Sequence, residues 1–128
     1  MGLLEQHKHQ GHTTIVLSGS FTDFLEIIKL RLGVDHVIGT KIKMVNGVCS
    51  GMIEGPLCFG ENKAIFLQQF IENAKLDINF GASFAYADSV TDVPILEMVG
   101  HPVATYPDKK LLQIACHVGW QILPAHTI

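Results

Sequence analysis

The sequence predicts an open α/β fold with a mostly parallel sheet covered by helices. Segments with the apolar period of an amphipathic helix alternate along the chain with short, β-branched apolar segments. The short segments are apolar on both sides, which is typical of parallel strands that are buried on both faces. The chain has 128 residues, the length of one ordinary domain, so we expect residues 1–128 to form a single domain.

The first third of the chain predicts a helix end, a strand and a second helix. Residues 3–11 have the composition of the last turns of a helix that ends at Gly11. Residues 13–19 are β-branched and apolar, as in a buried strand. Ser20 and Asp23 resemble a capping box, so we expect them to begin a helix over residues 22–32.

The middle of the chain predicts a short strand, a hairpin and a long helix. Residues 36–40 are apolar enough for a strand. The dipeptide Asn46-Gly47 favours a type I′ turn, which predicts a hairpin over residues 41–55. Residues 62–75 repeat apolar side chains on one helical face.

The last third repeats the alternation of strand and helix. We expect strands at residues 83–87 and 101–106, because both are short apolar segments. Helices are expected at residues 93–100 and 109–119, and residues 120–123 are expected to form a short tail. In such folds ligands bind at the carboxyl ends of the strands.

Composition argues against several classes of function. Hydrophobic residues make up 48% of the chain, yet no apolar run reaches the roughly 20 residues of a membrane span. The net charge is −3 and basic residues do not cluster, which argues against nucleic-acid binding. The three cysteines are scattered and predict neither a disulfide framework nor a zinc site, and Cys58 and Cys116 are expected to be buried structural thiols. These features favour a reducing, cytoplasmic setting.

Polar residues follow two of the predicted strands. Asp88 follows one strand and Asp92 comes one turn later, and two carboxylates are ligands that suit Mg²⁺. The alternative is that Asp88 is a turn residue and Asp92 only caps a helix. Ser18 and Gly19 end another strand, where they either bind a phosphate oxygen or simply form the turn.

Lys63 begins a predicted helix, where the helix dipole disfavours a cation. The position suggests an anionic partner, although a solvated surface lysine is the alternative. A hydroxyl, an ammonium group and two carboxylates on one side of an α/β sheet have the composition of a phosphoryl-transfer site.

Three segments resemble the haloacid dehalogenase (HAD) superfamily, specifically its subfamily IB, the phosphoserine-phosphatase-like hydrolases. "IVLSGSF" (15–21) is similar to the second motif of that family, and "GENKAIFLQQF" (60–70) is similar to the segment around its third-motif lysine. "YADSVTDVPILEMVGHPVATYPDKKLLQIACHVGWQIL" (86–123) is similar to the fourth motif and the tail that follows it. The resemblance implies a Rossmann-like, three-layer fold.

The resemblance also implies a role for each candidate residue. Ser18 and the Gly19 amide would bind the phosphoryl group of a small-molecule phosphomonoester, and Lys63 would neutralise its charge. Asp88 would ligate Mg²⁺, and Asp92 would support the metal through water and pair with Lys63. Thr91 replaces the asparagine of phosphoserine phosphatases proper, which argues against assigning phosphoserine as the substrate.

The family's first motif, Asp-x-Asp-x-Thr, supplies the nucleophile that becomes an aspartyl-phosphate. No two aspartates of this chain are separated by a single residue, so we expect the first motif, its central strand and the helical cap to be missing. The chain is therefore interpreted as the C-terminal part of a phosphatase, inactive in isolation. The strands at 13–18 and 83–87 would then pair directly, or the chain would dimerise or swap elements to fill the gap.

Two other hypotheses stay open. The chain is either a non-catalytic remnant or oligomeric module with a weak phosphate or metal pocket, or one half of a split enzyme. Whether it is an enzyme by itself, and which substrate the complete protein takes, are not predicted by the sequence.

Overall fold

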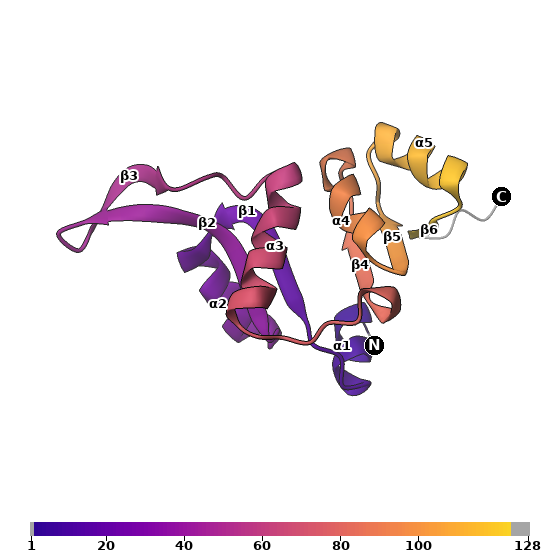
Figure 1. Cartoon of the computed structure of the whole chain (residues 1–128), viewed down its shortest axis with the longest axis horizontal. Helices are drawn as coiled ribbons and strands as arrows, with labels where there is room; N and C mark the ends of the chain where they lie inside the picture. The colour runs from indigo at the N-terminus through magenta and orange to yellow at the C-terminus, as the bar shows by residue number, and fades with distance from the viewer. Residues whose placement is uncertain (1, 124–128) are drawn as a thin grey trace. The chain divides into compact units, whose positions relative to one another are not determined.

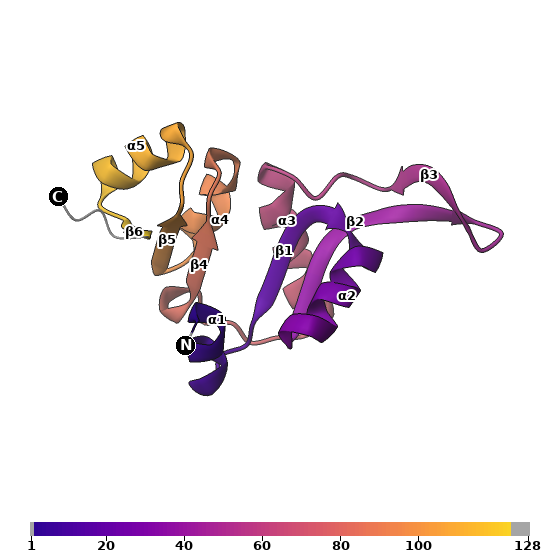
Figure 2. The same ribbon diagram turned by 180° about the vertical axis from the view of Figure 1, so that it is seen from behind.

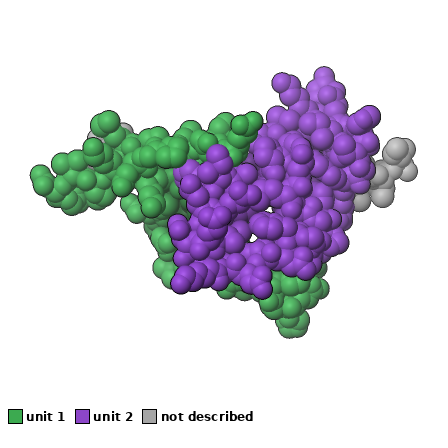
Figure 3. All heavy atoms as spheres, viewed as in Figure 1, with its two compact units in different colours: residues 1–62 green, residues 63–128 purple. Residues whose placement is uncertain are grey.

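A computed structural model describes residues 2–123 of the chain, with the side chains of residues 49–51 excepted. The chain divides into two compact units, residues 1–62 and residues 63–128 (Figure 3). Each unit is described by itself. The expected α/β fold with mostly parallel strands is confirmed, because three of the four strand pairings are parallel.

The first unit contains a three-stranded sheet with a helix against it (Figures 1 and 2). Its elements, in chain order, are α1 (Leu3–His9), β1 (Ile15–Phe21), α2 (Thr22–Leu32), β2 (His36–Val45) and β3 (Val48–Glu54). The strand order is β1-β2-β3, with β1 parallel to β2 and β3 antiparallel to it. Helix α2 packs on β1 and β2 through the buried side chain of Leu25.

The boundaries of α2 follow one sequence signal and contradict another. Gly33 ends the helix in the left-handed conformation, at a φ of 70°, as a C-terminal glycine should. The predicted capping box of Ser20 and Asp23 is wrong. Phe21 occupies the cap position, and no side chain there accepts a hydrogen bond from the helix. Strand β1 continues through Ser20 and leaves no room for the box.

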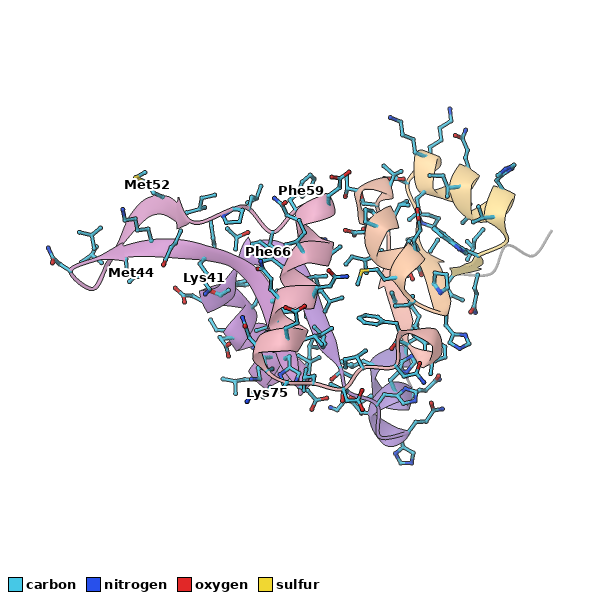
Figure 4. All side chains as sticks on the ribbon, viewed as in Figure 1. Lys41, Met44, Met52, Phe59, Phe66 and Lys75 are labelled. Atoms are coloured by element: carbon cyan, nitrogen blue, oxygen red, sulfur yellow. The ribbon has the colours of Figure 1, made fainter. Side chains whose placement is uncertain are left out.

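The hairpin forms where the turn dipeptide predicts it. Asn46 and Gly47 have φ values of 53° and 77°, and two successive positive φ angles are what a type I′ turn requires. Strand β2 runs unbroken from His36 into the hairpin, whereas the sequence predicted a separate strand over residues 36–40. Met44 and Met52 stand out from the hairpin, with 51% and 63% of their surface exposed (Figure 4).

The second unit holds a three-stranded parallel sheet, preceded by most of α3 (Glu61–Asn73). Its strands are β4 (Phe84–Ala87), β5 (His101–Thr105) and β6 (Gln121–Leu123), in that order. Residues 121–123 were expected to belong to a tail. They form a strand because Ala104 of β5 pairs with Ile122. Three residues are too few to show a strand pattern in the sequence.

Helices α4 (Val93–Met98) and α5 (Lys109–Val118) cover one face of this sheet (Figure 1). The core between them is fully buried and consists of Leu96, Ala104, Leu111 and Ala115. Ala85 and Ala87 of β4 pack against this core, and their small side chains let the helices approach the strands. Burial of this apolar cluster holds the carboxyl ends of β4 and β5 in place.

Two further expectations are corrected by the structure. The strands at 13–18 and 83–87 do not pair directly: within the described residues, β1 and β4 belong to different sheets and each pairs with one neighbour. Cys116 was expected to be buried but is exposed on α5, while Cys58 is buried as expected. Among residues 2–123, none of the helices combines the length and apolar character that a membrane crossing requires.

Asp35 ties the loop before β2 to the residue before β1. The N–H of Thr14 donates to Asp35 Oδ2 at 2.8 Å, and the Thr14 hydroxyl donates to the same atom at 3.2 Å. The backbone N–H of Thr14 is the main reason that the pKa of Asp35 lies below its usual value. Desolvation opposes it, and the Thr14 hydroxyl and the nearby His36 and Lys8 lower the pKa further. The ionised form of Asp35 is therefore the one that stabilises the fold.

We predict that this pair contributes to acid unfolding. Because the folded-state pKa is lowered, the contribution is complete above the unfolded pKa of about 4 and is lost as the pH falls through the folded value. In Asp35→Asn, urea unfolding should show a weaker loss of stability between about pH 4 and pH 2 than in the wild type. Asp77→Asn, a matched change at another exposed carboxylate, should leave that dependence as it is. Equal slopes in all three proteins would contradict the prediction.

Candidate phosphate and metal site

The corner after β4 carries both predicted metal-binding aspartates. Asp88 directly follows the strand, and a single 3₁₀ turn, Val90–Asp92, leads into α4. The Ser89 hydroxyl oxygen accepts a hydrogen bond from the Thr91 N–H at 3.2 Å, and this local bond caps the turn. The turn places Asp92 at the first residue before α4, where it is buried. A short apolar strand followed by a capped turn therefore delivers two carboxylates to one corner.

Asp92 forms an ion pair with Lys63. The Nζ atom of Lys63 lies 2.9 Å from Asp92 Oδ1, and the two side chains are only 14% and 13% exposed. The alternative that Asp92 serves only as a helix cap is not supported, because its side chain accepts no hydrogen bond from α4. Lys63 is likewise no solvated surface lysine, since it is held in a pair that excludes most water.

The ion pair leaves Asp92 incompletely satisfied. Although the distance is short, its angles fall outside hydrogen-bond geometry, and Oδ1 has no hydrogen-bond partner within the described residues. A buried carboxylate oxygen in that state is costly unless a further group binds it. An ordered water molecule in the coordination shell of a metal would meet this need.

Asp88 differs from Asp92 in being exposed at the end of β4. One exposed and one buried carboxylate fit Mg²⁺, which binds one or two protein carboxylates and keeps several waters. Residues 2–123 contain no cluster of three or more His, Cys, Asp or Glu side chains that could hold a metal by themselves. The donors present therefore suit a hydrated, oxygen-bound cation and do not suit an all-protein cage such as a zinc site.

Ser18 and Gly19 lie near the end of β1 in the first unit. Ser18 Oγ accepts a hydrogen bond from the Ser20 N–H at 3.1 Å, which curls the backbone around the half-buried hydroxyl. A Cβ at position 19 would lie 3.2 Å from the Cys58 carbonyl oxygen, a tight contact that favours glycine where the two backbones approach. The phosphate-binding role of Ser18 and Gly19 stays a prediction.

Thr40 is a buried residue near this strand end that sequence reasoning missed. Its hydroxyl donates to the Gly19 carbonyl at 3.1 Å and accepts from the Cys58 N–H at 3.0 Å, and the residue is fully buried. One hydroxyl thus joins β1, β2 and the loop that follows the hairpin. No signal in the sequence identified it, because a threonine is an ordinary residue in a strand.

Asp108 is a second residue that the sequence reasoning did not select. Its carboxylate accepts from the N–H groups of Leu111, at 2.8 Å, and Val90, at 3.1 Å. These two bonds, the Leu111 bond first, hold the pKa of Asp108 below its usual value. Desolvation opposes them, and the Ser89 hydroxyl and Lys110 lower the pKa further. An aspartate directly before a predicted helix was the signal that could have found it.

A family model described as haloacid dehalogenase-like hydrolase matches residues 1–97. The "Inhibition of morphological differentiation protein" of Streptomyces azureus is 34% identical over 97% of this chain and 44% of its own length. "Phosphoserine phosphatase SerB1" of Mycobacterium tuberculosis (strain ATCC 25618 / H37Rv) is 30% identical over 94% of this chain and 38% of its own length. The "Histidinol-phosphatase" of Neisseria meningitidis serogroup C (strain 8013) is 29% identical over 94% of this chain and 55% of its own length.

A solved structure shares the fold. The crystal structure of a protein of unknown function from Bordetella pertussis Tohama I superimposes with a TM-score of 0.84 at 32% identity. The superposition covers 94% of this chain and 54% of the Bordetella pertussis chain. The likeness fits the Rossmann-like fold that the motifs implied. This chain spans between 38% and 55% of the length of the three relatives above, so it corresponds to part of each.

Proposed function

Because the chain belongs to the haloacid dehalogenase-like hydrolases, we propose that it forms the C-terminal part of a Mg²⁺-dependent phosphatase. The observation that carries the proposal is the shielded ion pair of Lys63 and Asp92, with the exposed Asp88 four residues before Asp92 at the end of β4. Both units would belong to one hydrolase domain, residues 1–128. Its substrate would be a small phosphomonoester, as the names of the phosphoserine and histidinol phosphatase relatives suggest.

Each residue has a defined task in this proposal. Lys63 neutralises charge on the phosphoryl group, and its position is fixed because Asp92 holds the ammonium group at 2.9 Å. Asp88 and, through water, Asp92 would hold Mg²⁺, which when bound supplies positive charge to the phosphoryl oxygens. The Ser18 hydroxyl and the Gly19 N–H would donate hydrogen bonds to those oxygens.

The nucleophile would come from outside this chain's aspartates. In the complete protein a carboxylate of the Asp-x-Asp-x-Thr type attacks phosphorus, the alcohol leaves, and water then hydrolyses the aspartyl-phosphate. None of the six aspartates of the chain has that spacing. We therefore expect no hydrolysis by the isolated chain. The complete protein would be located in the cytoplasm.

A second candidate function is that of a non-catalytic or oligomeric module. It is favoured by the open sheet edges: β1 and β4 each pair with one strand within the described residues. An unpaired edge is a template for another chain. A homodimer, a swapped element or a separate polypeptide carrying the nucleophile strand would each satisfy these edges.

Complementation tests the proposal. Hydrolysis of an aryl phosphate with Mg²⁺ is measured for the chain alone and for the chain mixed with the N-terminal part of a relative that carries Asp-x-Asp-x-Thr. We expect activity in the mixture alone. Asp88→Asn should lower it by about 100-fold or more, because a metal ligand is lost.

The matched control is Asp77→Asn, which changes an exposed carboxylate away from the corner and should keep the activity of the mixture. Activity of the isolated chain would show that its own residues supply the nucleophile. If the mixture forms a complex, as judged by light scattering, but does not hydrolyse the phosphate, the hypothesis of a non-catalytic module is favoured over that of a phosphatase.

A further inference from the structure

We propose that Asp108 is a positioning residue for the metal corner, a proposal that rests on the proposed function. Asp108 touches neither of the two carboxylate groups assigned to the metal. It acts on the backbone between them, which determines where those two carboxylates lie. No motif of the chain assigns it this role.

Three hydrogen bonds carry the inference, and all lie within the second unit. Asp108 Oδ1 accepts from the Leu111 N–H at 2.8 Å, which caps α5. Oδ2 accepts from the Val90 N–H at 3.1 Å, in the middle of the metal corner. The N–H of Asp108 itself donates to the Asp88 carbonyl oxygen at 2.8 Å. The two carboxylate oxygens are thus divided between the helix and the corner.

This arrangement connects two neighbouring strand ends. Asp88 follows β4 and Asp108 lies just beyond β5, its parallel neighbour in the sheet. The bonds of Ser89 to Thr91 and Asp92 stay within the corner and leave it free to move as a body. The two bonds to Asp108 instead fasten the corner to the rigid start of α5. A corner held in this way keeps Asp88 and Asp92 at a fixed separation before a metal binds.

The variant Asp108→Asn separates positioning from helix capping. Asparagine is as good a helix cap as aspartate, so its single side-chain oxygen can still accept from Leu111. Its amide nitrogen then takes the place of Oδ2 and offers a donor to the Val90 N–H, which is itself a donor. The variant should therefore keep α5 and the backbone bond from the Asp108 N–H to the Asp88 carbonyl, and free only the middle of the corner at Val90.

The measurement is backbone amide hydrogen exchange and ¹⁵N–¹H chemical shifts of the full chain. In Asp108→Asn we expect exchange at Val90 to rise by about tenfold or more, while Leu111 stays protected. The amide resonances of Asp88 and Asp92 should shift as well, since each lies two residues from Val90, whose N–H loses its acceptor. Asp77→Asn, the matched control, should leave all four amides unchanged.

Unchanged shifts at Asp88 and Asp92 in Asp108→Asn would overturn the proposal, whatever the metal does. A titration with Mg²⁺ alone, followed by the same resonances, forms a separate arm. If the wild type binds Mg²⁺, Asp108→Asn should weaken binding by about 10- to 100-fold. If the wild type does not respond to Mg²⁺ while the amide shifts appear, the metal assignment fails and the positioning of the corner by Asp108 stands.

Discussion

Thr40→Val is expected to lower the free energy of unfolding by about 2 to 4 kcal/mol. Valine has almost the same shape as threonine, so packing around this fully buried position is preserved. The change removes the hydroxyl that donates to the Gly19 carbonyl and accepts from the Cys58 N–H. The buried Cys58 N–H and the part-buried Gly19 carbonyl then lose their partner. Each such loss costs about 1 to 3 kcal/mol, with the lower value for the part-buried group.

Urea unfolding followed by circular dichroism measures this change, with Thr40→Ser as the control. Serine keeps the hydroxyl and loses only a methyl group, so it should cost about 1 kcal/mol. Wild-type stability in Thr40→Val would mean that the two backbone groups find other partners. Since Gly19 is a proposed phosphate ligand, the valine variant should also weaken orthophosphate binding more than the serine variant does.

The fold was largely predictable because its elements depend on local patterns. The Asn46-Gly47 turn and the Gly33 helix end were both found from residues whose backbone preference determines the conformation. Strand β6 was missed because three residues show no period of their own, and they pair only because β5 is already in place. The capping box at Ser20 failed for a related reason, since β1 extends over it.

The candidate site was predictable only where its residues are chemically unusual. Lys63 stood out because a cation near a helix start needs an anion, and Asp92 is that anion in the structure. Thr40 and Asp108 did not stand out, because one is an ordinary strand residue and the other an ordinary helix cap. Their importance arises from partners 18 to 21 residues away in sequence, which only the folded chain brings together.

Lys63→Met should destabilise the second unit by about 3 kcal/mol, because it leaves Asp92 as an unpaired charge in a largely buried place. The sign of the effect is informative. Lys63 is the third residue of α3, where the helix dipole disfavours a cation. If the ion pair contributed nothing, methionine would stabilise the helix by about 0.3 to 1 kcal/mol. In urea unfolding of Lys63→Met, a loss of stability would therefore indicate a stabilising ion pair, and a gain would indicate that the pair contributes nothing.

A double-mutant cycle assigns the effect to the pair. In Lys63→Met the Asp92 carboxylate has lost its cationic partner, and Asp92→Asn removes that unpaired charge. The double variant should therefore be more stable than Lys63→Met alone. Simple addition of the two single effects would mean that the 2.9 Å contact carries no coupling energy. The same double variant should stay inactive in the complementation assay, because restoring stability does not restore the cation that the phosphoryl group needs. The pair therefore links the fold to the proposed chemistry: the residue that neutralises the substrate is held in place by the residue that supports the metal.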